Sequence, residues 1–392
     1  MKFIVSSTAL SSHLQAISRV INSKNSLPIL DCILIELQDG TLTMTASDGE
    51  TTLSTCIEVS DYNGEGKFAI SSKTILEALK ENPEQPLNFN INPDTLEIIV
   101  KYQNGKYSLM AQNGDEFPIA KQMSPSAVNI TIAADVMLTG INRCVFATAD
   151  DELRPVMNGI YFDITQQDVT LVASDGHKLV RNKSYASRGD EKAAFILPKK
   201  PSTLLKNILP KEQGDVQISF DDKNALFTLE NYQMSCRLIE GRYPNYNSVI
   251  PQNNPHKATI DRATFISALK RVSVFSSQAS SLIKLSLQEN SMTISAQDID
   301  FSTSAEAAFE ENFKVPSALF TSMPRIISTT YLILRGEEGT FCNLAKYWVL
   351  RASFLFSAAI FFLAPIYIIT LLFQIINLLT SSCYQHGHRT YA

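Results

Sequence analysis

Apolar and polar residues alternate over the opening segment MKFIVSS, and this alternation predicts a β-strand. Between residues 8 and 21 the spacing changes. There Leu10, Leu14 and Ile17 recur at intervals of four and three residues, which is typical of one face of a helix. The chain therefore begins with a strand followed directly by a helix.

Hairpin signals fill the next part of the chain. The runs ILDCILIEL, TLTMTAS and TTLSTCIEV are separated by Asp-Gly pairs at 39–40 and 48–49, which predict tight turns between antiparallel strands. A second half-unit has the same order, with a strand, a helix over Ser72–Lys80 and further strands around an Asn-Gly pair at 104–105. The pattern indicates an α+β fold built from antiparallel sheets and few helices.

The same signature occurs three times. LTMTASDGE (42–50) returns as LVASDGHKL (171–179) and, more weakly, as MTISAQDID (292–300). Asp48 and Asp175 are 127 residues apart, and Asp175 and Asp298 are 123 apart. A period of this length is the size of a whole domain, so the chain is expected to be a tandem of similar domains.

The repeat sets the expected domain boundaries. The first domain is assigned to residues 1–126 and the second to 127–253, while 254–311 form only the first half of a third domain. Helices are expected near 134–147, 200–209 and 261–275. Residues 312–392 form a divergent tail, and the third domain is predicted to be incomplete.

The tail differs from the repeats in charge and hydropathy. Residues 1–311 carry 28 Lys and Arg against 37 Asp and Glu, whereas residues 312–392 carry six against two. Residues 353–379 contain no charge and are long enough to cross a bilayer as a helix. The tail is interpreted as the product of a shifted reading frame or misassigned gene. A membrane anchor and a buried helix are the alternatives, and Pro365 disfavours the buried helix.

Basic residues recur on the predicted helices although the net charge of the chain is −5. A basic helix face on an acidic molecule is typical of a surface that binds nucleic acid, although single lysines more often only solvate a helix. The candidate DNA-binding residues are Arg19, Lys24, Lys73, Lys80, Arg143, Lys199, Lys200, Lys206, Lys270 and Arg271.

Enzymatic chemistry is not indicated. Ser174, Asp175 and His177 lie within four residues, too close for a catalytic triad, and Asp175-Gly176 is better explained as a turn. No phosphate-loop, dinucleotide or zinc-protease motif occurs, so no catalytic residue, cofactor or metal is predicted. The group Cys383, His386 and His388 is interpreted as incidental. The six cysteines form no C-x-x-C pair and the N-terminus is not a signal peptide, which favours a cytoplasmic protein.

Five features together resemble the bacterial DNA polymerase III beta subunit, the sliding clamp, over about residues 1–308. They are the threefold repeat and the segments SLPIL (26–30), LRPVMNGIYF (153–162), ASDGHKL (173–179) and LIEGRYPNYNSVIP (238–251). The resemblance implies a DNA clamp fold, with helices lining a central hole and antiparallel sheets outside. It implies a processivity factor that encircles duplex DNA without reading its sequence and tethers the replicative polymerase.

The resemblance also implies particular sites. Lys24 matches a DNA contact of the family, whereas the loop at 150–152 and Pro155-Val156 depart from it. Polymerases, the clamp loader and repair proteins would bind through short apolar peptides in a pocket between the second and third domains. The matching positions are Met157, Ser174, Gly176, His177, Lys178, Leu179, Pro244, Ser248 and Val249.

Ring closure in the family pairs two copies of the chain. Tyr107 of one copy would meet Val274 and Phe275 of the other. Because the last strands of the third domain have no counterpart here, a truncated, non-functional clamp and a clamp-like protein anchored to the membrane through 353–379 are the alternative interpretations.

Overall fold

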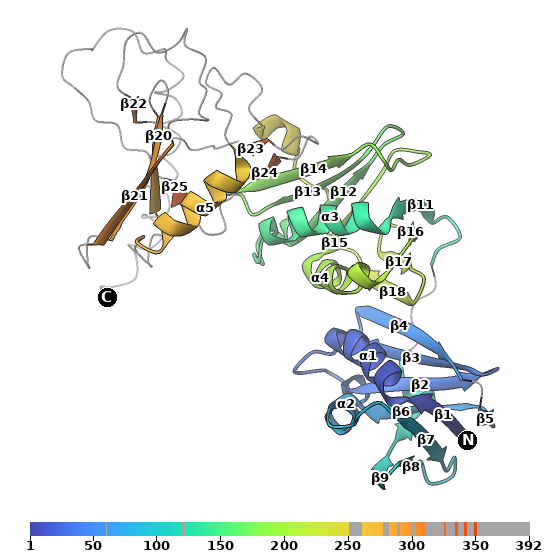
Figure 1. Ribbon diagram of the computed structural model, residues 1–392. Helices are drawn as coiled ribbons and strands as arrows, with labels where there is room; N and C mark the ends of the chain where they lie inside the picture. The colour runs from blue at the N-terminus through green and yellow to red at the C-terminus, as the bar shows by residue number, and fades with distance from the viewer. Residues whose placement is uncertain are drawn as a thin grey trace, which may run out of the picture. The chain divides into compact units, whose positions relative to one another are not determined.

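A computed structural model describes residues 1–59, 61–118, 123–250, 261–276, 282–287, 291–298 and 303–309, and four two-residue strands farther along the chain. The chain divides into two compact units, Met1–Pro255 with Tyr331–Trp348 and His256–Thr330 with Val349–Ala392 (Figure 1). The first unit contains the first two sequence repeats, and the second unit contains the third.

The first repeat has two helices that pack against each other, α1 (Ser7–Ile17) and α2 (Ser72–Lys80). Its strands and 3-10 helices (η) are β1 (Lys2–Ser6), η1 (Ser18–Val20), η2 (Pro28–Asp31), β2 (Cys32–Gln38), β3 (Thr41–Ser47), β4 (Thr51–Glu58), β5 (Tyr62–Asn63), β6 (Gly66–Ser71), β7 (Pro86–Ile91), β8 (Glu97–Tyr102), β9 (Gly105–Met110), β10 (Gln112–Asn113) and η3 (Gly114–Glu116).

The second repeat has the same plan, with α3 (Ala134–Cys144) packed against α4 (Lys199–Ile208). Its other elements are β11 (Val128–Ala133), η4 (Val145–Ala147), η5 (Pro155–Met157), β12 (Gly159–Ile164), β13 (Val169–Ser174), β14 (Leu179–Ser184), β15 (Ala193–Pro198), η6 (Leu209–Lys211), β16 (Asp215–Phe220), β17 (Asn224–Thr228), β18 (Tyr232–Arg237) and η7 (Tyr246–Val249). The short strands β23 (Leu334–Arg335) and β24 (Phe341–Cys342) add to the edge of β14.

The second unit contains α5 (Arg262–Ser273) against an antiparallel sheet of β19 (Leu282–Leu287), β20 (Met292–Asp298) and β21 (Thr303–Phe309). Two short strands, β22 (Arg325–Ile326) and β25 (Val349–Leu350), pair with β19. The segment 353–379 lies outside the described residues. The predicted boundaries at 126, 253 and 311 and the predicted incompleteness of the third domain stay predictions.

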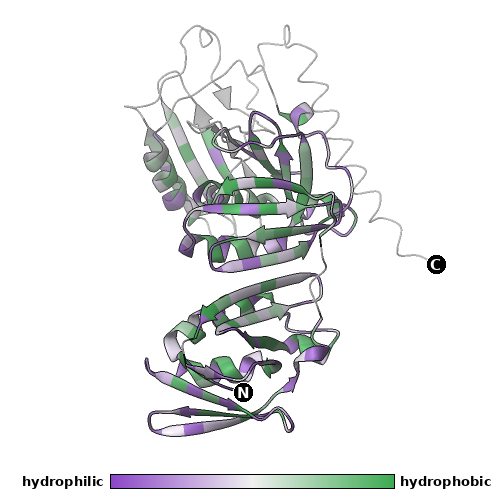
Figure 2. Ribbon diagram, turned by 90° about the vertical axis from the view of Figure 1, so that its right-hand side faces the viewer, coloured by the Kyte–Doolittle hydropathy of each residue, from purple (hydrophilic) through white to green (hydrophobic). Residues whose placement is uncertain are grey.

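Strand pairing in the first unit is antiparallel throughout the described pairs, as the hairpin signals predicted. The sheet orders are β5-β1-β7-β8-β9, β10-β6-β2-β3-β4-β18-β17-β16-β11 and β15-β12-β13-β14-β24-β23. Along β3, Leu42, Met44 and Ala46 are buried while the threonines between them are half-exposed. Figure 2 shows this banding of hydrophobic and hydrophilic residues on the strands. The core therefore lies between the sheets and the helices.

The first predicted helix is longer than the observed one. Ser6 accepts a hydrogen bond from the backbone N–H of Ala9 and so begins α1, but the α-helix ends at Ile17. The chain then tightens into η1, and Ile21 lies beyond it with extended dihedral angles. The second helix has its predicted bounds, Ser72–Lys80. The third divides in the same way as the first, into α3 and η4.

The two repeats are joined by backbone pairing. The edge strand β4 of the first repeat pairs with β18 of the second from Thr51↔Cys236 to Thr55↔Tyr232, and this produces one nine-stranded sheet. The Ser54 hydroxyl donates to the Gln233 carbonyl oxygen across the same joint, at 3.3 Å. Each strand thus satisfies the edge groups of the other, which removes two open sheet edges.

A histidine lies at one end of this joint. His13 Nδ1 is 2.6 Å from the Thr55 hydroxyl, and that hydroxyl donates to the Asn231 carbonyl oxygen at 2.8 Å. The hydroxyl therefore accepts the Nδ1–H of His13. The imidazole also stacks on Tyr232, with ring centroids 5.9 Å apart. Burial lowers the pKa of His13, Lys211 lowers it further, and Glu212 partly opposes them.

We expect the first unit to lose stability as the pH falls below about 6.5, the ordinary pKa of histidine. The unfolded chain takes up a proton there, whereas folded His13 resists protonation because its pKa is lowered. Urea unfolding between pH 5 and 8 measures the effect. His13→Gln should flatten this dependence, and Gln15→Ala, an exposed change on the same helix, should not. An unchanged slope in His13→Gln would contradict the prediction.

Candidate nucleic-acid interface and peptide pocket

Helix α4 presents a basic stripe opposite a buried face. Leu204, Leu205 and Ile208 are buried, whereas Lys199 and Lys206 lie two turns apart on the outer side. Lys206 is exposed, and Lys199 forms an ion pair with Asp150 at the start of the neighbouring loop. Helix α4 thus carries two lysines away from its buried face, and their contact with DNA stays a prediction.

The end of α1 carries two more predicted cations. Arg19 is exposed on η1, and Lys24 is exposed on the loop that follows. Asn25 holds this loop together, because its Nδ2 donates to the Asn22 carbonyl oxygen at 3.1 Å and to Asp31 Oδ1 at 2.7 Å. The loop that presents Lys24 is consequently tied at both ends. We call residues 21–27 the Lys24 loop.

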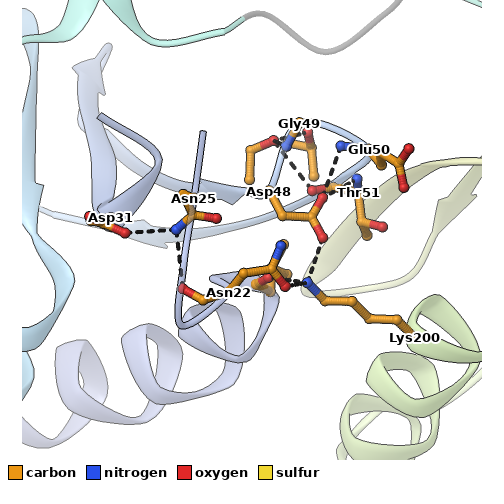
Figure 3. Close-up of polar contacts among 11 residues, drawn as sticks. Asn22, Asn25, Asp31, Asp48, Gly49, Glu50, Thr51 and Lys200 are labelled. Carbon is orange, nitrogen blue, oxygen red and sulfur yellow. Dashed lines mark hydrogen bonds and ion pairs between the residues drawn. The ribbon is translucent and has the colours of Figure 1, made fainter. Parts of the chain in front are cut away.

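Lys200 differs from the other predicted DNA contacts. Its Nζ lies 2.5 Å from Asp48 Oδ2, 2.6 Å from Asn22 Oδ1 and 2.5 Å from the Val20 carbonyl oxygen (Figure 3). All of these acceptors belong to the first repeat. The side chain of Asp48 is only 6% exposed, and that of Lys200 is 36% exposed. The structure thus places Lys200 in the joint between the repeats.

The remaining predicted cations lie in several environments. Lys73 and Lys80 are exposed on α2, and Lys270 and Arg271 are exposed on α5 in the second unit. Arg143 on α3 is half-buried and donates to Asn182 Oδ1 on β14 at 3.0 Å. Its guanidinium therefore also supports the packing of helix on sheet.

Acidic residues interrupt the basic surface at the loop 150–154. Arg154 donates to Asp151 at 2.8 Å, and this hydrogen bond, with the backbone N–H of Leu153, lowers the pKa of Asp151. Leu153 itself is exposed. Within the loop Asp151 pairs with Arg154, whereas Asp150 pairs with Lys199 on α4.

An apolar patch lies on the β12–β15 sheet of the second repeat. Tyr161 and Tyr243 stack with centroids 4.7 Å apart, and Tyr246 leans against Tyr161 at 6.3 Å. We call these three residues the tyrosine cluster. Leu179 packs against the same cluster, and Val156, Val172, Ile196 and Ile239 surround it. Burial and the neighbouring Asp163, which accepts the Tyr246 hydroxyl at 2.8 Å, raise the pKa of Tyr246.

The predicted pocket residues differ in exposure, and of them Leu179 packs against this patch. Met157 and Ser174 are buried, while Lys178 and Leu179 are half-buried. Gly176, His177, Pro244, Ser248 and Val249 are exposed, with Val249 at 57%. Sequence reasoning did not name Tyr161 or Tyr246, which form part of this patch, among the candidate residues. Both lie in segments that carried the resemblance. However, the alternation of apolar and polar residues along a strand does not distinguish an aromatic ring at the surface from one in the core.

The Ser174–Lys178 segment is a turn, as predicted. Asp175 Oδ1 accepts the backbone N–H groups of His177 and Lys178, at 3.0 and 2.8 Å, and Oδ2 pairs with the Lys178 ammonium. The Ser174 hydroxyl donates to the Lys178 carbonyl oxygen at 2.8 Å. Burial alone would raise the pKa of Asp175, but these partners lower it overall. The Ser174 hydroxyl and the Asp175 carboxylate are therefore both engaged in hydrogen bonds of the turn.

The predicted ring-closing residues lie in separate units. The ring of Tyr107 on β9 is tilted by 30° against that of Tyr102, with centroids 4.7 Å apart, and its hydroxyl accepts from Asn82 Nδ2 at 2.9 Å. Among the described strands, β9 pairs only with β8, and Met110 at its end is 68% exposed. In the second unit, Val274 and Phe275 are exposed beyond the end of α5. Tyr107 is half-buried against the core of its unit, and the predicted ring closure stays a prediction.

Two further sequence predictions concern the tail. Within the described residues, no helix is long and apolar enough to span a membrane, and no three His, Cys, Asp or Glu side chains form a group that could hold a metal. Residues 353–379 and the group Cys383, His386 and His388 lie outside the described part of the chain.

Comparison with known proteins agrees with the repeat. Models for the DNA polymerase III beta subunit match in series: the N-terminal domain over residues 1–121, the central domain over 131–245 and the C-terminal domain over 247–323. The beta sliding clamp of Bacillus subtilis (strain 168) is 24% identical over 348 residues, which is 86% of this chain and 92% of the relative. That of Treponema pallidum is 25% identical over 344 residues, 88% and 91% of the two chains.

Solved structures with the same fold are also sliding clamps. The Pseudomonas aeruginosa clamp bound to griselimycin has a TM-score of 0.75 at 22% identity, covering 81% of this chain and 85% of that one. The Thermotoga maritima beta subunit has a TM-score of 0.71 at 22% identity, covering 80% and 84%.

The tandem α+β repeats, joined through one continuous sheet, have the DNA clamp fold. The chain belongs to the DNA polymerase III beta subunit family, the bacterial sliding clamps. The family assignment made from the sequence is thereby confirmed.

We expect Asp175→Ala to lower the free energy of unfolding by about 1–3 kcal/mol, because two turn amides and a lysine lose a charged acceptor. Asp175→Asn should cost less, since the amide oxygen still accepts from the turn. Thermal or urea unfolding measures both changes. Asp222→Ala at an exposed position is the control. Equal losses from Asn and Ala would show that the ion pair, and not the turn, matters.

Proposed function

We propose that this chain is a DNA sliding clamp that surrounds duplex DNA and tethers the replicative polymerase. The tandem of three clamp-domain matches over residues 1–323 is the observation that carries this function. The clamp acts as an accessory subunit and has no catalytic site of its own. The engagement of Ser174 and Asp175 in a turn supports that interpretation.

Electrostatics favour duplex DNA as the ligand. Arg19, Lys24 and Lys206 are exposed on helices or at helix ends of a chain with a net charge of −5. Duplex DNA presents a phosphate charge about every 1.7 Å along its axis, so such cations bind it without reading sequence. Loose contact with phosphates lets a clamp slide, whereas bonds to base edges would stop it.

The polymerase, the clamp loader and repair proteins are proposed to bind through short apolar peptides. The tyrosine cluster and Leu179 supply an apolar surface, and Val249, at the other end of η7 from Tyr246, is exposed. A Leu or Phe anchor of a peptide would bury its side chain there. A second copy of the chain is the third proposed partner. Its support is the open edge of β9 among the described strands, and the exposed Val274 and Phe275.

We expect the chain to stay on a nicked circular duplex after loading and to leave when the circle is cut. Lys24→Glu with Lys206→Glu should weaken binding and reduce the slope of log K against log salt by about 0.9 for each lost phosphate contact. Filtration of labelled protein on DNA measures retention. Lys101→Glu on β8, an exposed lysine of a strand, is the charge-matched control.

The same retention on circular and linear DNA would refute the encircling function. An unaltered salt slope in the double variant would refute the basic helix surface. Lys200 is left unchanged in this experiment, because a glutamate there would face Asp48 and disturb the joint.

We expect Val249→Asp to weaken binding of a short Leu/Phe peptide roughly tenfold to a hundredfold, because a carboxylate replaces an exposed apolar side chain. Leu179→Asp should weaken it at least as much. Fluorescence polarisation with a labelled peptide measures the affinity. Val128→Asp on β11, in another sheet, is the control. Unchanged affinity in Val249→Asp would mean that the peptide binds elsewhere.

A further inference from the structure

Lys200 uses all three protons of its ammonium on acceptors from the other repeat. The acceptors are Asp48 Oδ2, Asn22 Oδ1 and the Val20 carbonyl oxygen, at 2.5, 2.6 and 2.5 Å. An ammonium group has three N–H donors and no acceptor, so this set satisfies it completely. A lysine held in this way has no proton left for a phosphate.

Two of these acceptors lie where the Lys24 loop begins. Val20 ends the 3-10 turn that follows α1, and carbonyl oxygens at such an end lack partners within the helix. A cation placed there bonds the last carbonyl and also complements the negative end of the helix dipole. Here that cation comes from α4 of the second repeat. Asn22 is the second residue of the Lys24 loop, so the same ammonium also fixes the direction in which the loop leaves the helix.

The third acceptor is anchored by the repeated Asp-Gly turn. Asp48 Oδ1 accepts the backbone N–H groups of Glu50 and Thr51, at 2.9 and 2.6 Å, which leaves Oδ2 for Lys200. The equivalent turn of the second repeat is self-contained, since Lys178 fills the corresponding place beside Asp175. Thr51 stands where Lys178 stands, and a threonine cannot neutralise the carboxylate. Asp48 therefore takes its cation from across the joint.

Burial of Asp48 makes the loss of its ion pair with Lys200 costly. Because the Asp48 side chain is nearly enclosed, removal of Lys200 would leave a carboxylate without a counter-charge. It would also remove the contact that ties Asn22, at the start of the Lys24 loop, to the second repeat. Figure 3 shows the ammonium reaching from α4 into the space between the turn at Asp48 and the Lys24 loop.

We propose that Lys200 is a positioning residue: from the second repeat it holds the Lys24 loop in the conformation that presents Lys24 to DNA, and it makes no DNA contact itself. Only the effect of Lys200 on DNA binding rests on the proposed function. The anchoring of the loop is independent of DNA.

The first experiment needs no DNA. Hydrogen exchange of backbone amides in the full chain should be at least roughly tenfold faster over residues 22–27 in Lys200→Met than in the unaltered protein, with α2 amides as the internal reference. Exchange in the Lys24 loop that does not change would overturn the anchoring, whatever the chain does with DNA.

The second experiment is a double-mutant cycle on a labelled duplex, read as the slope of log K against log salt. Lys24→Ala should reduce the slope by about 0.9. If Lys200 acts through Lys24, Lys200→Met reduces it by a similar amount and adds nothing in the Lys24→Ala background. If Lys200 contacts phosphate itself, the two reductions add, which would overturn the proposal.

Two further variants distinguish anchoring from a direct phosphate contact, because the two predict opposite effects on DNA binding or on its salt slope. Asp48→Asn removes a negative charge and releases Lys200. Anchoring predicts weaker DNA binding, whereas a direct contact predicts equal or tighter binding. Lys200→Arg would keep a direct phosphate contact. However, a planar guanidinium cannot match three acceptors arranged around one ammonium, so anchoring predicts that arginine does not restore the salt slope.

Asn22→Ala covers the case in which the Lys200 variants fail to fold. Asn22 is exposed and its change removes one of the three acceptors without leaving a buried charge. Weaker DNA binding that disappears in the Lys24→Ala background supports the anchoring, and unaltered binding opposes it. If the unaltered chain binds no duplex at all, the proposed function fails, while hydrogen exchange still decides the anchoring.

Discussion

The pairing of β4 with β18 is the contact through which two repeats become one structure. Each strand would otherwise be the exposed edge of its own sheet, with unpaired N–H and C=O groups. Joined, they lie in the interior of a nine-stranded sheet with one register. That register brings the end of α1 near the start of α4, and it also places His13 beside Tyr232. The polar contacts on either side of the joint follow from this alignment.

The repeated Asp-Gly turn shows how one local structure acquires different roles. In both repeats the aspartate accepts two backbone N–H groups, and a preceding serine closes the turn. The difference is the cation on the second carboxylate oxygen. Lys178 supplies it locally in the second repeat, whereas Lys200 supplies it from another domain in the first. One residue, Thr51 or Lys178, therefore decides whether the turn is self-contained or forms part of a joint.

Charge on the helices likewise has two uses. Lysines with exposed ammonium groups, such as Lys24 and Lys206, contribute to a field that attracts phosphate. Lys200 lies on the same helix as Lys206 but carries its charge inward to a buried carboxylate. Counting basic residues on helices cannot separate these uses. The separation depends on which side chain has an acceptor within reach from a neighbouring domain.

Local patterns in the sequence were sufficient for the elements and the family. The alternation in TLTMTAS, the spacing of Leu10 and Leu14 and the Asp-Gly pairs report interactions within a few residues, so their structures could be predicted. The position of Lys200 could not, because its three acceptors lie about 150 to 180 residues away along the chain. The tyrosine cluster was missed for the same reason, since Tyr161 meets Tyr243 only when strand β12 and the segment after β18 fold together. Short-range periodicity encodes strands and helices, whereas the partners of a charged or aromatic side chain depend on contacts between distant segments.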